Sequence, residues 1–101
     1  MPVWYKSLNE FLQDLDWSMA EMDRYLADRK AGKPGQGTIV QLETLSQYLQ
    51  TVSQNVRSGK MPPKPVRHSQ SMAWILVDSW DYADPLGLKV MRVNSHYLNE
   101  L

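Results

Sequence analysis

Apolar residues recur with the spacing of an α-helix in two long stretches of the chain. The first stretch has intervals of 4, 3, 4, 3 and 4 and consists of Leu8, Leu12, Leu15, Met19, Met22 and Leu26. The second has intervals of 3, 4, 3 and 4 and consists of Leu42, Leu45, Leu49, Val52 and Val56. Residues three and four apart lie on the same face of a helix, so each stretch predicts one amphipathic helix with a buried stripe.

Both stretches begin with a capping signal. Ser7 is followed three residues later by Glu10, and Thr38 is followed by Gln41 in the same way. In such a capping box the hydroxyl accepts a hydrogen bond from the backbone N–H three residues on, and the longer side chain reaches back. The helices are therefore predicted to run over 7–30 and 38–58, with a glycine-rich turn between them. Their similar lengths and the short connection predict an antiparallel helical hairpin that frames the fold.

The chain after residue 59 divides into a linker and two shorter segments. Three prolines lie in 60–70, and we expect this segment to be extended, without regular structure. Segment 71–83 fits either a helical face or a buried strand, because so short an apolar run does not separate the two. Segment 85–100 is predicted to be helical, since Asp84-Pro85 suits an N-cap and the first helical position.

These segments predict one all-α domain over residues 1–101, a bundle of about four helices built on the hairpin. The alternative is an α+β fold in which the helical hairpin is followed by a C-terminal β-hairpin formed from residues 74–80 and 88–93.

Composition narrows the class of protein. The 101 residues contain 11 acidic and 11 basic side chains and no cysteine, which removes disulfides and thiolate chemistry. No apolar run approaches the length of about 18 residues that a membrane span needs, and the N-terminus has no basic region followed by an apolar block. We therefore expect a soluble, cytoplasmic protein that does not bind membranes.

Charge is unevenly distributed along the neutral chain. No acidic residue lies between Glu43 and Asp78, and this gap contains four cationic residues, Arg57, Lys60, Lys64 and Arg67. One hypothesis is that this basic segment binds the phosphate backbone of a nucleic acid. The alternative is that it folds back over the acidic first helix, where the charges would cancel.

Few residues suggest catalysis. The two histidines, His68 and His96, each lack a second histidine three or four residues further on, so no helical metal pair is expected. Asp78 and Asp81 are interpreted as a solvated edge; together with His96 they are also the residues of an alternative small-enzyme hypothesis. We expect no catalytic site, no cofactor and no metal.

Large side chains outside the predicted stripes point to a contact surface. The chain contains four tryptophans and six methionines, and both residue types are enriched where proteins meet. The favoured hypothesis is a non-enzymatic protein-interaction module, such as a small regulatory, accessory or immunity-type protein, that also forms a homodimer. Its candidate partner-binding residues are Trp17, Arg57, Lys60, Lys64, Arg67 and Trp74.

Overall fold

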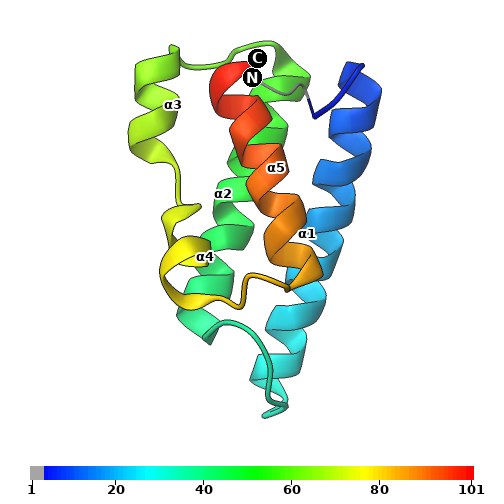
Figure 1. Cartoon of the computed structure of the whole chain (residues 1–101), viewed down its shortest axis with the longest axis vertical. Helices are drawn as coiled ribbons and strands as arrows, with labels where there is room; N and C mark the ends of the chain where they lie inside the picture. Colours follow the sequence, from blue (N-terminus) through cyan, green and yellow to red (C-terminus); the bar gives the residue numbers. More distant parts are fainter. Residues whose placement is uncertain (1–3) are drawn as a thin grey trace.

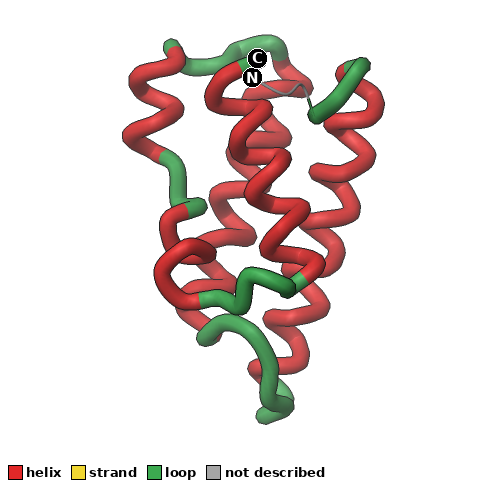
Figure 2. Tube along the Cα trace, in the orientation of Figure 1, coloured by secondary structure: helices red, strands yellow, loops and turns green. Residues whose placement is uncertain are grey.

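The computed structural model describes residues 4–101, and this part of the chain contains helices and loops but no strand (Figures 1 and 2). The helices are α1 (Leu8–Lys30), α2 (Ile39–Ser58), α3 (Lys64–Gln70), α4 (Trp74–Ser79) and α5 (Pro85–Asn99). The predicted all-α class is confirmed. The alternative with a C-terminal β-hairpin is wrong, because both segments proposed as strands lie largely within α4 and α5.

The helix ends form where the capping signals are. The Ser7 hydroxyl accepts from the Glu10 backbone N–H at 3.2 Å, and Thr38 forms a reciprocal capping box with Gln41. At the start of α5 the Asp84 carboxylate accepts from the Gly87 N–H at 2.9 Å. These bonds satisfy backbone donors that have no partner within their own helix, which is why short polar side chains fix where each helix begins.

Three helices form the body of the molecule, and α1 contacts both α2 and α5. Figure 1 shows the chain descend along α1, return along α2 and, after two short helices, ascend again along α5. The helices α3 and α4 lie on the side away from α1, and α3 packs against α5. The resulting molecule measures 38 × 24 × 24 Å.

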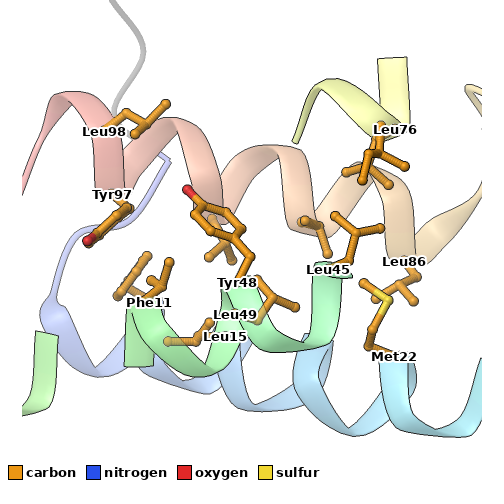
Figure 3. Close-up of a cluster of buried hydrophobic side chains, with 14 of the residues drawn as sticks. Phe11, Leu15, Met22, Leu45, Tyr48, Leu49, Leu76, Leu86, Tyr97 and Leu98 are labelled. Atoms are coloured by element: carbon orange, nitrogen blue, oxygen red, sulfur yellow. The ribbon is translucent and has the colours of Figure 1, made fainter. Parts of the chain in front are cut away.

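The core lies between the three long helices (Figure 3). On α2 the predicted stripe is buried throughout, from Leu42 to Val56. On α1 the fully buried residues are Phe11, Leu15, Ser18 and Met22, whereas Leu8 is exposed. The buried face is thus rotated from the predicted stripe, because α1 is covered by two neighbouring helices rather than by α2 alone.

The proline-rich segment contains a helix that the sequence pattern did not predict. Pro62 and Pro63 precede α3, and Pro65 lies in its first turn, where a backbone N–H has no intrahelical acceptor in any case. The prediction of an extended linker over 60–70 is therefore wrong for Lys64–Gln70. Counting this helix, the described chain has five helices rather than about four.

Trp80 fixes the corner between α4 and α5 against the rest of the fold. Its buried indole stacks on Tyr25 of α1, with ring centroids 6.0 Å apart, and lies against Gly37 in the loop between α1 and α2. The Tyr25 hydroxyl donates to the Asp84 carboxylate at 3.0 Å, so both ends of the corner are attached to α1. Burial, with a smaller contribution from the bond to Asp84, raises the pKa of Tyr25 to about 12 and keeps it a donor.

Candidate protein-binding surface

Five large apolar side chains are exposed on neighbouring parts of α4, α5 and the loop between them. Their exposed fractions lie between 37% and 82%, and the residues are Trp74, Val77, Tyr82, Leu88 and Met91. Trp74 and Val77 are three residues apart and share a face of α4, as Leu88 and Met91 do on α5. We call this set the α4–α5 patch.

A small hollow lies within the α4–α5 patch. It has a volume of about 80 Å³, and its wall contains four of the five patch residues, Val77, Tyr82, Leu88 and Met91. The buried Trp80 also lines it, so the anchored corner supplies one rigid wall. A concave apolar site with a fixed wall suits a single inserted side chain, which is how anchor residues are held at protein interfaces.

The charge next to the α4–α5 patch is acidic. Asp81 lines the hollow, and Asp78 is exposed beside Val77 on α4. On α5, Lys89 faces α1 instead, where it forms an ion pair with Asp14 at 3.3 Å. The patch therefore combines an apolar centre with an acidic edge.

Trp17 lies at a different place, on the side of the molecule formed by α1 and α5. The residue is 41% exposed, and the Lys89 ammonium lies 4.9 Å from the centroid of its ring. Trp4 has the same kind of partner, since the Arg92 guanidinium lies 5.3 Å from its centroid. Both tryptophans are covered on one face by a cation of α5, and neither belongs to the α4–α5 patch.

Three of the four predicted basic residues have partners inside the fold. Arg57 bonds both carboxylate oxygens of Asp16 at 2.8 Å, which links α2 to α1. Lys64 donates to the Asn99 carbonyl at 2.8 Å, and Arg67 donates to the Tyr97 carbonyl at 2.6 Å. The last two bonds satisfy carbonyls in the final turn of α5, where the helix dipole also favours cations.

Lys60 is exposed in the loop before α3, and its ammonium forms no ion pair or hydrogen bond among residues 4–101, although its backbone N–H donates to the Ser58 hydroxyl. The basic segment thus serves largely to hold α5 and α1 in place. The structure does not gather the four cations into one phosphate-binding face, so the nucleic-acid hypothesis gains no geometric support.

The residues of the enzyme hypothesis are not brought together. His96 is buried near the C-terminal end of α5. The centroid of its ring lies 5.1 Å from that of Tyr5 and 5.3 Å from that of Phe11. Asp81 precedes the other end of the same helix, and the part of α5 from Pro85 to His96 separates the two residues by about 16 Å at about 1.5 Å per residue. The hollow that Asp81 lines does not include His96, and the described residues contain no cluster of side chains suited to hold a metal ion.

The sequence pattern identified one residue of the α4–α5 patch, Trp74, and missed the other four. A usable signal was present in α5: Leu88 and Met91 are apolar but lie outside the buried line of Leu86, Val90 and Val93. Tyr82 had no such signal, because it lies in a loop whose path depends on how Trp80 packs.

Within residues 4–101, no helix combines the length and the apolar character that crossing a membrane requires. Comparison with protein-family models, with curated proteins and with solved structures gives no match. A function for this chain is therefore inferred from its surface chemistry alone.

Proposed function

We propose that this protein is a non-enzymatic interaction module that binds another protein through the α4–α5 patch. The observation that supports it is the gathering of Val77, Tyr82, Leu88 and Met91 around one apolar hollow, with Trp74 exposed three residues from Val77 on α4. Aromatic residues and methionine are the types enriched in the centres of protein interfaces. Contiguous exposed apolar surface of this kind is uncommon unless something binds there.

The partner is inferred from the chemistry of the patch. The hollow accepts one large apolar side chain, and the acidic edge at Asp78 and Asp81 favours cations beside it. An amphipathic helix with an apolar anchor flanked by Lys or Arg meets both conditions. A cytoplasmic location and a homodimer formed through a surface other than the patch remain part of this proposal, whereas a second copy of the chain seated on the patch is the competing occupant.

The chemistry can be tested with a library of random 15-residue peptides selected on the immobilised protein. We expect enriched peptides to carry a large apolar residue with Lys or Arg nearby. Leu88→Asp should abolish their binding, because it places a charge in the wall of the hollow. Leu8→Asp is the matched control: Leu8 is equally exposed (49% against 48%) and lies in the first turn of α1.

Two outcomes of the selection contradict the proposal. One is enrichment of acidic peptides, and the other is equal binding to the two variants. Light scattering over a tenfold dilution series tests whether a second copy of the chain occupies the patch. A dimer that Leu88→Asp converts to the 11.7 kDa monomer would show that a second copy, rather than a foreign helix, occupies the patch.

A further inference from the structure

A second cavity lies on another part of the molecule, between α2, α3 and the end of α5. Its volume is about 290 Å³, at the lower end of the range for small-molecule sites. Its polar lining residues are Thr44, Gln47, Tyr48 and Thr51 from α2, Arg67 and Gln70 from α3, and Tyr97 from α5. None of these belongs to the α4–α5 patch, so a ligand could occupy this cavity whether or not the patch binds a protein.

Arg67 is the one charged residue that the described chain contributes to the wall of this cavity, and it is only 5% exposed. One terminal nitrogen donates to the Tyr97 carbonyl, and the guanidinium lies 5.4 Å from the centroid of the Tyr97 ring. Its Nε is buried and has no hydrogen-bond partner among residues 4–101. No carboxylate in that range forms an ion pair with it.

A buried guanidinium without a counter-ion is unusual, because burying an unpaired charge is costly. The last turn of α5 offsets part of that cost, since the negative end of a helix is equivalent to about half an elementary charge. The remaining positive charge lies at a cavity to which the described residues contribute no acidic side chain, and the unpartnered Nε shows that the fold does not use every donor of this guanidinium. These are the conditions in which an anion binds best.

The rest of the wall defines the ligand further. Met72 is partly exposed and supplies apolar surface, and the threonines and glutamines supply neutral hydrogen-bonding groups. We propose that this cavity binds a small organic anion, with a carboxylate or phosphate group on Arg67 and an apolar body of about ten non-hydrogen atoms over Met72, a size that suits its volume.

The proposal can be tested on the full chain by two-dimensional NMR with four probes. Phenylacetate and phenyl phosphate carry the anionic group on an apolar body, phenylacetamide is the neutral match, and inorganic phosphate lacks the body. We expect saturable shifts at Arg67 and along Thr44–Thr51 with phenylacetate or phenyl phosphate, with Kd of about 1 mM or tighter. Phenylacetamide and inorganic phosphate should each bind at least about tenfold more weakly, because each lacks one of the two contacts.

A negative charge introduced at the rim supplies the second arm of the test. Gln47→Glu changes no shape but places a carboxylate in the wall of the cavity, and we expect it to weaken binding of the preferred probe by about tenfold or more. Gln13→Glu, the same change on the exposed face of α1, should alter the affinity by less than about twofold, because exposed charges far from the site are screened. Both variants leave the Arg67 bond to α5 intact, whereas Arg67→Gln also removes that bond and can unfold the chain.

Binding of phenylacetamide with the same affinity as the anionic probes would overturn the proposal. So would shifts that map outside the cavity, or the absence of saturable shifts with every anionic probe.

Discussion

Gly37 shows how a single residue supports the candidate surface. Its φ of +84° lies in the left-handed region, and a Cβ added there would meet Trp80 at 2.9 Å and Leu42 at 3.0 Å. Only glycine suits this position, for two reasons. Its φ is positive, and a Cβ has no room beside Trp80, the residue that anchors the α4–α5 corner. The sequence indicates a turn at this glycine, but the contact with Trp80, 43 residues further on, is a property of the fold.

We expect Gly37→Ala to lower the free energy of unfolding by more than Gly32→Ala does. Both residues have a positive φ, so each substitution costs about 1–2 kcal/mol of backbone strain. Only at Gly37 does the new methyl group meet other atoms, and overpacking adds about 1–3 kcal/mol. Urea denaturation measures both values. An equal decrease in the free energy of unfolding for the two variants would mean that Trp80 does not pack closely against Gly37.

The burial of His96 makes the stability of the protein depend on pH. Its ring packs on Tyr5 and Phe11, its Nδ1 has no partner among residues 4–101, and burial lowers its pKa, opposed in part by nearby Glu100. The unfolded chain therefore binds the proton more readily than the folded one. Stability from this residue is complete above the unfolded pKa of about 6.5 and is lost as the pH falls below it.

Accordingly, the free energy of unfolding should decrease between pH 7.5 and pH 5.5, and His96→Phe should make that decrease smaller. Phenylalanine retains a ring between Tyr5 and Phe11 but cannot be protonated. His68→Gln is the control, since His68 is exposed on α3. Chemical denaturation at both pH values decides the point. A pH dependence that is unchanged in His96→Phe would show that the buried imidazole is not responsible.

At the scale of the elements, the sequence predicts the long helices well and the short ones poorly. The periodicity and caps of α1, α2 and α5 are local properties, so they can be recognised without the fold. The helix α3 depends on distant partners: its residues Lys64 and Arg67 hold carbonyls at the end of α5. No local pattern reports such a bond, which is why these two residues looked like free cations in the sequence.

Because the buried face of α1 is rotated from the predicted stripe, two leucines of that stripe should differ in their contribution to stability. Leu15 is fully buried and Leu8 is about half exposed, although both belong to the same sequence stripe. Leu15→Asp should cost several kcal/mol, about 3 or more, because it buries a charge without a partner. Leu8→Asp should change stability by less than about 0.5 kcal/mol, since it lies at the surface near a helix N-terminus that favours acidic residues.

Thermal melts followed by circular dichroism compare the two variants directly. Similar melting temperatures for Leu8→Asp and Leu15→Asp would contradict the described packing of α1. A normal melt for Leu8→Asp also validates that variant as the control for binding.

At the scale of the whole molecule, the candidate surface exists only because α4 and α5 meet at an anchored corner. Trp74 and Val77 are neighbours on α4, and the packing of Trp80 brings Leu88 and Met91 of α5 to the hollow that Val77 lines. Outward-facing tryptophans could be recognised from the sequence, yet Trp17 and Trp74 have different surroundings in the fold. Trp17 is covered on one face by Lys89, whereas Trp74 remains 59% exposed on α4.

The most direct measurement is site-specific photo-crosslinking in the cells that make the protein. A benzophenone amino acid would replace Leu88 in the α4–α5 patch or, as the matched control, Leu8 at the far end of α1. We predict one dominant crosslinked product at position 88 and none of that mass at position 8. Its crosslinked peptide should contain Lys or Arg beside an apolar residue. The same products at both positions, or none at position 88, would contradict the role proposed for the α4–α5 patch.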